Sequence, residues 1–410
     1  MRILYISQYF PPEAGATQTR AYEMARNLVR LGHQVTMIAE IPNHPSGIIP
    51  PEYRGKWIER VDLEGIDVIR VWVKTSPVKN FRQRILFYLS FMFASTLAGL
   101  FLTHGHFDFV YATSPPLFTG ASGLLISILK RIPFVFEVRD IWPESAVALG
   151  ELANPMAIKC ATRLEEACYA HAKKIVVVTQ GIRSRLAQRG IQPAKIALVP
   201  NGANTELFQF KAEARDRVRS QLNLEGKFVA VYAGIHGIAQ GLETVVETAW
   251  LLKENPDVHI LLVGDGPKKK ELAELIRQRE LSNLTLVPEQ PRQLIPDYLS
   301  AADVALVPLR KLEIFSSALP SKMFDAWACQ LPVLLSVSGE ARDVLDGCEG
   351  GLFIPPEDPD ALKNGILACQ TAPQLRKKWG ENGRRFTEEF YSRQALAEEL
   401  AAVLTSIKPG

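Results

Sequence analysis

Short apolar runs rich in Val, Ile, Leu and Phe alternate with segments of helical periodicity along the whole chain of 410 residues. We expect strands at 2–7, 34–39, 66–73, 107–114, 133–138, 174–179, 228–234, 258–264, 284–288, 303–309 and 332–336. Strands this uniformly apolar, alternating with helices, are typical of parallel sheets that helices cover on both faces. Because single hydrophobic cores stop growing at about 250–300 residues, the pattern predicts an α/β protein with two doubly wound domains.

Both halves begin with a strand that leads into a glycine-containing turn and a helix. The stretch "VPNGANTELFQF" (199–210) marks a boundary, since Pro-Asn-Gly is typical of a loop. We therefore predict an N-terminal domain at 1–200, a second domain at 201–389, and a last helix at 390–410 that packs back on the first domain. Ligands of such folds bind beyond the carboxyl ends of the strands, so the expected site is a deep cleft that both domains face.

Composition limits the class of protein. The net charge of +3 and the lack of a dense basic and aromatic stretch argue against a nucleic-acid partner. Five cysteines without a C-x-x-C pair predict reduced thiols in a cytoplasmic protein. The opening "MRILYIS" reads as a strand and not as a signal peptide.

One segment departs from this pattern. Residues 85–103 carry no formal charge and are long enough to span a bilayer, and Lys74, Lys79, Arg82 and Arg84 precede them. The segment is a buried core helix, a spanning helix, or a helix that rests on the inner leaflet with its basic flank near anionic lipid. We favour the membrane-surface helix, and expect Phe87→Glu with Phe91→Glu to disrupt its contact with lipid.

Glycine-rich turns follow the first strand of each half. "PPEAGATQT" holds Gly15, and "YAGIHGIAQGLE" holds Gly234, Gly237 and Gly241 ahead of an amphipathic helix. Such turns let backbone N–H groups approach a phosphate. Neither turn is the G-x-G-x-x-G of dinucleotide-binding dehydrogenases, and the G-x-G of "VGDGP" is not continued, so a dehydrogenase is not expected.

Six motifs in order carry a resemblance: "PPEAGA…GHQVTMI", "VPNGAN", "YAGIHGIAQGLE", "LVGDGP", "AADVALVPL" and "DAWACQLPVLLS". The chain resembles the retaining GT-B glycosyltransferases (family 4-like). "FEVRDIWPES", "NHPSG" and "LPSK" make it most similar to the bacterial enzymes of the fucosamine and colanic-acid transferase type. The resemblance implies two Rossmann-like domains and a hexosyl transfer from a nucleotide-diphosphate sugar, with UDP as the expected nucleotide.

The same resemblance implies the reaction partners. The acceptor would be a hydroxyl of a lipid-linked glycan or a polysaccharide or lipopolysaccharide precursor, and the anomeric configuration would be retained. The enzyme would work at the inner face of the cytoplasmic membrane as a peripheral protein. No metal and no other cofactor is expected, because "DPD" (358–360) precedes an apolar-periodic stretch and is better explained as a helix N-cap.

By the resemblance, Asp325 at the head of its helix takes the position that holds the donor ribose, since a carboxylate accepts two hydroxyl hydrogen bonds. The chain also departs from the family. Ser317 stands eight residues before Asp325, where a Glu is usual, and Ile235, His236 and Gln240 stand near the usual Arg and Lys of the diphosphate clamp. We expect Lys322 to replace part of that clamp, with help from the backbone of Gly237; the alternative for both Asp325 and Lys322 is a solvated helix residue.

The expected donor-binding residues are Gly15, Ala16, His236, Gly237, Gln240, Gly264, Pro288, Leu319, Ser321, Lys322 and Asp325. The expected catalytic residues are Glu137, Arg139 and Asp140, which follow or end a strand, together with Lys322. The alternative for Arg139 and Asp140 is an ion pair that orders their loop. His44 is expected on the acceptor side.

Two other classes of protein use the same sequence features. A non-hydrolysing sugar-nucleotide epimerase has the same double-domain fold and would turn over its substrate without an acceptor. A non-catalytic membrane scaffold with a decayed donor site would fit the departures at Ser317, Ile235 and Gln240.

Overall fold

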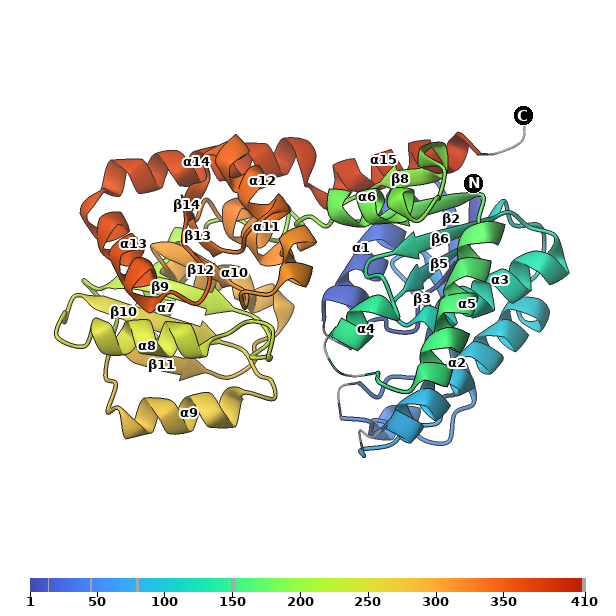
Figure 1. Ribbon diagram of the computed structural model, residues 1–410, viewed down its shortest axis with the longest axis horizontal. Helices are drawn as coiled ribbons and strands as arrows, with labels where there is room; N and C mark the ends of the chain where they lie inside the picture. The colour runs from blue at the N-terminus through green and yellow to red at the C-terminus, as the bar shows by residue number, and fades with distance from the viewer. Residues whose placement is uncertain (14, 45, 79–80, 149, 151, 408–410) are drawn as a thin grey trace. The chain divides into compact units, whose positions relative to one another are not determined.

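The computed structural model describes residues 1–407 other than 14, 45, 79, 80, 149 and 151. The chain forms two compact units, Met1–Pro200 with Arg393–Gly410, and Asn201–Ser392 (Figure 1). The first junction lies at the Pro-Asn-Gly loop. The chain returns to the first unit at Ser392 and Arg393, three residues later than the predicted position between 389 and 390.

Unit 1 is built on an eight-stranded sheet of order β3-β4-β2-β1-β5-β6-β7-β8. Neighbouring strands are parallel, except that β3 runs antiparallel to β4. The strands are β1 (Arg2–Ile6), β2 (Gln34–Glu40), β3 (Ile58–Leu63), β4 (Ile66–Val71), β5 (Phe109–Ser114), β6 (Phe134–Val138), β7 (Lys174–Val177) and β8 (Ile196–Leu198). Strand order reverses at β1, so the carboxyl ends of β1 and β5 form the topological switch point where such sheets bind ligands.

Helices cover both faces of this sheet, as the apolar strands predict. α1 (Ala16–Arg30) and α15 (Arg393–Thr405) pack on one face. α2 (Phe81–Phe101), α3 (Leu117–Lys130), α5 (Pro155–His171) and α6 (Gln180–Gln188) pack on the other, with α2, α3 and α5 side by side (Figure 1). The short helix α4 (Glu144–Ala148) and the 3-10 turns η1 (Pro51–Tyr53) and η2 (Pro193–Lys195) complete the unit.

α2 is the segment predicted to contact membrane. By length and composition, Arg82–Phe101 could cross a bilayer, but 28% of this stretch is buried in the protein. Phe91 and Ala98 belong to the core, and Phe87 packs against it. Substitutions of Phe87 and Phe91 therefore do not isolate membrane contact, because Phe91 is buried and Phe87 packs partly against the core.

Unit 2 holds a six-stranded parallel sheet of order β11-β10-β9-β12-β13-β14. Its strands are β9 (Phe228–Ala233), β10 (Val258–Val263), β11 (Leu284–Val287), β12 (Val304–Pro308), β13 (Val333–Ser336) and β14 (Gly351–Phe353). α8 (Glu243–Leu251), α9 (Lys269–Gln278) and α13 (Pro359–Thr371) pack on one face. α10 (Ile295–Ala301), α11 (Ser321–Ala328) and α12 (Glu340–Cys348) pack on the other, with α14 (Pro373–Phe390) against them. The remaining elements are α7 (Ala212–Gln221), η3 (Arg292–Leu294) and η4 (Glu313–Ser317).

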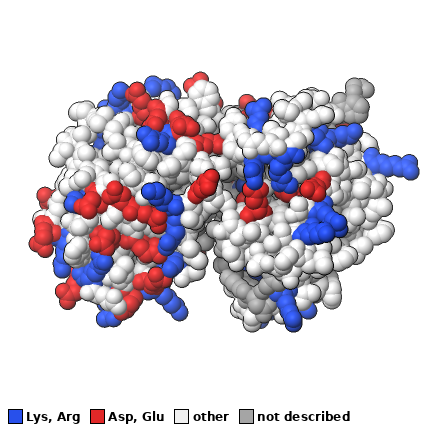
Figure 2. Space-filling view, in the orientation of Figure 1, with Lys and Arg blue, Asp and Glu red and all other residues white. Residues whose placement is uncertain are grey.

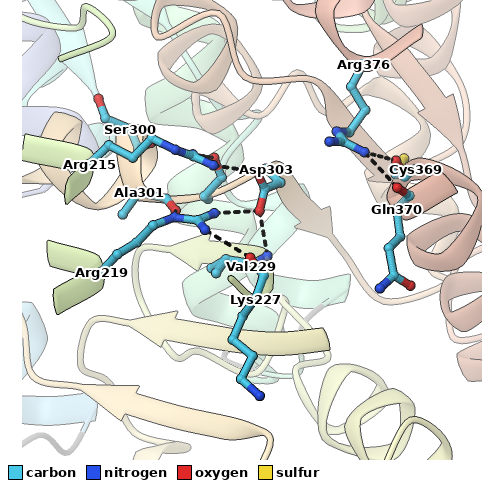
Figure 3. A network of polar contacts seen from close by, with 11 residues as sticks. Arg215, Arg219, Lys227, Val229, Ser300, Ala301, Asp303, Cys369, Gln370 and Arg376 are labelled. Carbon is cyan, nitrogen blue, oxygen red and sulfur yellow. Dashed lines mark hydrogen bonds and ion pairs between the residues drawn. The ribbon is translucent and has the colours of Figure 1, made fainter. Parts of the chain in front are cut away.

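A polar network joins α7 to the amino ends of β9 and β12 (Figure 3). Two guanidinium groups converge on Asp303, with Arg215 Nη2 at 2.7 Å and Arg219 Nη2 at 2.6 Å. The backbone N–H of Val229 also donates to Asp303, at 2.8 Å. A separate contact in the same view ties Arg376 of α14 to the carbonyl groups of Cys369 and Gln370 in α13.

We expect Asp303→Ala to lower the free energy of unfolding by about 2–3 kcal/mol, because it leaves two guanidinium groups and one N–H without their acceptor. The measurement is urea unfolding. Asp346→Ala is the matched control: Asp346 pairs with Arg342 one turn away, and both side chains are more than half exposed, so its loss should cost less than about 1 kcal/mol. Equal losses for the two variants would contradict the role of Asp303.

Candidate functional site

In unit 2, the turn after β9 is shaped around Lys322. Gly234 has a φ of 150°, and a methyl group there would stand 2.1 Å from Cε and 2.8 Å from Nζ of Lys322. The ammonium group lies 5.5 Å from the centre of the Tyr232 ring, whose hydroxyl donates to the carbonyl of Ile235 at 2.6 Å. Only glycine at 234 leaves room for this lysine. The predicted glycine-rich turn and the predicted Lys322 therefore form one structural arrangement.

Lys322 and Asp325 are three residues apart in α11, which places both side chains on one face of the helix. They line one cavity of about 30 Å³, enough for about one or two water molecules, at the ends of β9 and β12. The rest of its lining is apolar: Val231, Ala233, Ile295, Leu299, Ala305, Leu306, Val307 and Ala326. Burial lowers the pKa of Lys322, and the nearby Asp325 carboxylate opposes this shift.

The start of α11 differs from the prediction. Pro320 is the N-cap and the helix begins at Ser321, so Asp325 is its fifth residue and not its head. Ser321 and Lys322 occupy the first turn, where unpaired N–H groups and the helix dipole favour an anion. Leu319 is 6% exposed and belongs to the core, which corrects its assignment to the donor: its apolar side chain anchors the loop before the helix.

The side chain of His236, which is among the predicted donor-binding residues, is fully buried. Its backbone joins two loops: its N–H donates to the Asp265 carbonyl at 2.7 Å, and its carbonyl accepts from the Lys268 N–H at 2.9 Å. Burial lowers the pKa of the imidazole, and Lys269 adds to this shift. Both ring nitrogens lack a hydrogen-bond partner among the residues that the structure describes.

The other predicted residues of unit 2 lie around the same turn or at the next strand. A methyl group on Gly264, whose φ is 146°, would stand 2.0 Å from the Gly234 carbonyl oxygen, so the two glycine turns touch. A methyl group on Gly237 would stand 2.5 Å from Oε1 of Gln240. Pro288 follows β11 and is exposed. The structure thus brings Gly234, Gly264 and Lys322 together, with Gly237 and Gln240 farther along the same loop.

In unit 1, Glu137 is a buried structural anion, which corrects its assignment as catalytic. It is completely buried and pairs with Arg20 at 2.8 Å. It also accepts hydrogen bonds from the Tyr111 and Thr113 hydroxyls at 2.8 Å and 2.6 Å. Burial alone would raise the pKa of Glu137, but the positive charges of Arg20 and Arg139 and these hydrogen bonds lower it. The Glu137 carboxylate is therefore occupied by protein groups through this ion pair and these hydrogen bonds.

Arg139 and Asp140 extend from the end of β6 beyond this anion. Nη2 of Arg139 donates to the Thr17 hydroxyl at 2.9 Å, close to Gly15 and Ala16. Gly15 is the N-cap of α1, and both it and Ala16 are exposed. Oδ2 of Asp140 accepts from the Ser145 hydroxyl at 2.8 Å. Arg139 therefore connects the end of β6 to the glycine turn after β1.

A pair of buried carboxyl groups, Glu13 and Glu40, was not predicted. Oε1 of Glu13 accepts the backbone N–H groups of Asn43 and His44, both at 2.7 Å. Glu40 accepts from Gln8 Nε2 and Asn43 Nδ2, both at 2.8 Å. Burial raises the pKa of Glu13 to about 7, although the two backbone hydrogen bonds oppose it, and burial together with Glu13 raises the pKa of Glu40. The Glu within "PPEAGA" was the available signal. His44, beside it, is exposed.

No group of three or more His, Cys, Asp or Glu residues is placed to hold a metal ion in the part of the chain that the structure describes. The carboxylate of Asp358 accepts the N–H of Ala361 at 2.8 Å and caps α13, which confirms the N-cap interpretation of "DPD".

Comparison with known proteins identifies both halves of the chain. Residues 15–202 match the family described as Glycosyl transferase 4-like domain, and residues 214–386 match Glycosyl transferases group 1. A protein of Escherichia coli strain K12 named for colanic acid biosynthesis (glycosyl transferase WcaI) is 24% identical over 91% of this chain and 93% of its own. The MMP alpha-(1->4)-mannosyltransferase of Mycolicibacterium hassiacum is 29% identical over 98% and 97%.

Solved structures share the fold over nearly the whole chain. The sucrose-phosphate synthase from Thermosynechococcus elongatus gives a TM-score of 0.77 at 21% identity, covering 99% of this chain and 98% of its own. The Anabaena protein HepE, in complex with UDP and glucose, gives 0.74 at 16% identity, covering 99% and 100%.

We predict that Glu13 makes stability fall as pH rises from 5 to 8. Its folded-state pKa of about 7 lies above the ordinary 4.5, so the folded chain keeps a proton that the unfolded chain releases in this window. The stabilisation is complete below about pH 4.5 and is lost as pH rises through 7, a change of about 2–3 kcal/mol. Urea unfolding at pH 5, 6, 7 and 8 measures it.

Glu13→Gln should reduce this slope, because the amide does not titrate and of the two buried carboxyl groups only Glu40, whose pKa burial also raises, is left to contribute. Glu52→Gln, which changes an exposed carboxyl of the same unit, should keep the slope of the unmodified protein. If Glu13→Gln has the unmodified slope, the buried carboxyl is not the cause.

Proposed function

Because the chain belongs to the GT-B glycosyltransferases, with a 4-like first half and a group 1 second half, we propose a specific reaction. The enzyme transfers a sugar from a nucleotide-diphosphate sugar to a hydroxyl of a saccharide precursor, with retention of configuration. The observation that carries the proposal is the placement of Lys322 and Asp325 on one helix face, in one cavity, with Gly234 leaving space for the lysine.

The two side chains suit the two polar parts of a nucleotide. A carboxylate accepts hydrogen bonds from two hydroxyl groups, as the ribose of a donor presents them to Asp325. An ammonium in the first turn of a helix attracts a diphosphate, and partial burial strengthens the attraction. Lys322 therefore takes over the role of the absent Arg and Lys clamp. The complex of HepE with UDP supports UDP as the nucleotide.

The proposed step breaks the bond between the sugar C1 and the diphosphate oxygen. The acceptor oxygen attacks C1 from the same face, and its proton passes to the leaving phosphate, so charge and atoms balance. Lys322, the amino end of α11 and the backbone of the glycine turns would stabilise the negative charge that develops on the diphosphate. These groups would do what a metal ion does in other transferases, and we propose that this enzyme needs no metal ion. Arg139 and Asp140 are the candidates for contacting the sugar, and His44 for the acceptor side.

Calorimetry with UDP, GDP, ADP and free uridine, with and without EDTA, tests this assignment. We expect one diphosphate to bind in the presence of EDTA. Asp325→Ala should weaken both UDP and uridine by about 1–3 kcal/mol, the scale for losing a charged hydrogen-bond partner. Lys322→Met should weaken the binding of UDP by a similar amount and leave the binding of uridine unchanged, because uridine has no phosphate.

Lys363→Met is the control, since Lys363 lies in α13 and pairs with Asp360 at 2.9 Å. Nucleotide binding that EDTA abolishes would contradict the metal-free proposal. If none of the diphosphates binds, the protein is not a transferase of this kind. That result would favour the non-catalytic scaffold. Turnover of a UDP-sugar without any acceptor would favour the epimerase.

We also propose that unit 1 works at the inner membrane surface. Leu86, Phe93, Leu97 and Phe101 form an exposed stripe along α2, with exposed fractions between 41% and 69%. On the neighbouring α3, Leu125, Ile128 and Leu129 are also exposed. Figure 2 shows few charged side chains over α2 in this view. Exposed apolar surface of this extent is typical of a contact with lipid or with another protein, and Arg82 at the start of α2 favours anionic lipid.

Flotation with vesicles that contain anionic lipid measures this contact. We expect Phe93→Glu with Leu97→Glu to reduce the bound fraction at least about tenfold, because two apolar side chains no longer enter the lipid. Trp57→Glu with Ile58→Glu is the matched control, since these side chains are 68% and 52% exposed outside α2 and α3. Unchanged flotation of the first variant would exclude α2 as the contact, and resistance to carbonate extraction would show that α2 spans.

A further inference from the structure

Six rings of unit 1 follow one another in a row that the proposed donor site does not use. We name it the aromatic row; in order it contains His44, Tyr9, Phe87, Tyr88, Phe118 and Trp142. Successive ring centres are 5.1, 6.4, 5.5, 6.0 and 6.5 Å apart. These spacings are those of rings in contact, so the row is continuous.

The row runs along the ligand-binding edge of the sheet. Tyr9 follows β1, Phe118 lies in the first turn of α3 after β5, and Trp142 follows β6. It therefore crosses the switch point between β1 and β5, where doubly wound sheets bind their ligands. One end, His44, lies beside the buried Glu13, and the other end, Trp142, is two residues beyond Asp140.

The rings of the row differ from those of the core. Phe91, Phe134 and Phe136 are at most 1% exposed, whereas every ring of the aromatic row is partly or largely exposed. The row also carries polar ends: the imidazole of His44 and the hydroxyls of Tyr9 and Tyr88, which are hydrogen-bonded to each other. It is a half-buried band of apolar rings, exposed at His44, with hydroxyl groups at its margin.

We propose that the aromatic row binds the pyranose rings of the acceptor saccharide, an inference that rests on the proposed function. A pyranose presents C–H groups on its faces and hydroxyls around its edge. Ring faces stack on the former, and the polar ends of His44, Tyr9 and Tyr88 hydrogen-bond the latter. The row ends near Arg139 and Asp140, so a stacked saccharide would bring a hydroxyl toward the candidate catalytic loop.

A polyprenyl chain is the poorer occupant of the row. An isoprenoid has no hydroxyl groups with which the imidazole of His44 and the hydroxyls of Tyr9 and Tyr88 could form further hydrogen bonds. The exposed stripe of α2 is wholly apolar and suits lipid. Phe87 and Tyr88 of the row directly follow Leu86 of that stripe. The first turns of α2 thus separate a lipid-facing surface from a saccharide-facing one, as a lipid-linked saccharide requires.

Equilibrium binding to three probes tests the proposal. They are lipid-linked saccharides extracted from membranes of the host, the saccharide released from them by mild acid, and a polyprenyl diphosphate without sugar. We expect Tyr88→Leu and Phe118→Leu each to weaken binding of the released saccharide about threefold to tenfold, the scale of one aromatic stacking contact. Tyr88→Phe and Phe118→Tyr, which keep the ring, should retain most of the affinity.

Trp57→Leu is the control: Trp57 contacts Trp72, with ring centres 5.1 Å apart, and is outside the row. Its affinity for the released saccharide should be unchanged. Far-ultraviolet circular dichroism and the midpoint of urea unfolding show whether each variant is folded, because neither depends on the substituted rings as a signal or on a bound saccharide.

Three results would overturn the proposal. The first is no binding of the released saccharide by the unmodified protein. The second is unchanged saccharide affinity in folded Leu variants, which would make the row structural. The third is a loss seen only with the sugar-free polyprenyl diphosphate, which would assign the row to the isoprenoid. A failure of UDP, GDP and ADP all to bind would remove the proposed transferase function but would leave saccharide binding by the row measurable.

Discussion

The buried ion pair between Arg20 and Glu137 fixes the geometry on which the first unit depends. Arg20 also donates to the carbonyl oxygens of Val199 and Pro200, at 2.8 Å and 2.6 Å. One guanidinium thus holds α1, the end of β6 and the last residues before the second unit. A buried charged group needs ion-pair or hydrogen-bond partners for all of its polar atoms. Here the partners of Arg20 and Glu137 determine where the glycine turn and the Arg139 loop lie.

The second unit uses a different constraint to place a charge. Lys322 stands over a glycine and an aromatic ring, so its ammonium is positioned by shape and by the ring face rather than by a close carboxylate. A lysine held in this way remains able to receive an anion. In the proposed reaction, α11 would supply the positive charge for the diphosphate, so the lack of the expected Arg and Lys near the turn after β9 does not by itself indicate a decayed site.

The sequence predicted the parts of this molecule that depend on local pattern. All eleven expected strands are present, and the three that were missed are short or polar: three of the six residues of β3 are charged, and β8 and β14 have three residues each. The spacing of three between Lys322 and Asp325 was also enough to place them together. The burial of Glu137 was not predictable, because its partner Arg20 is 117 positions away and local pattern does not reveal such pairs. The burial of His236 was not predictable for the same reason, since the turn after β10 encloses it.

The orientation of α2 is the feature that the hydrophobic pattern of the sequence predicts least. A helix that is apolar on every side has no polar face to indicate which residues turn toward the sheet. Only its neighbours decide, and they bury Phe91 and leave Phe93 and Leu97 exposed. The same packing directs Phe87 and Tyr88 toward the rings of Tyr9 and Phe118. Two surfaces of different chemistry, one aromatic with hydroxyl groups and one aliphatic, therefore arise on a single helix whose sequence distinguishes neither.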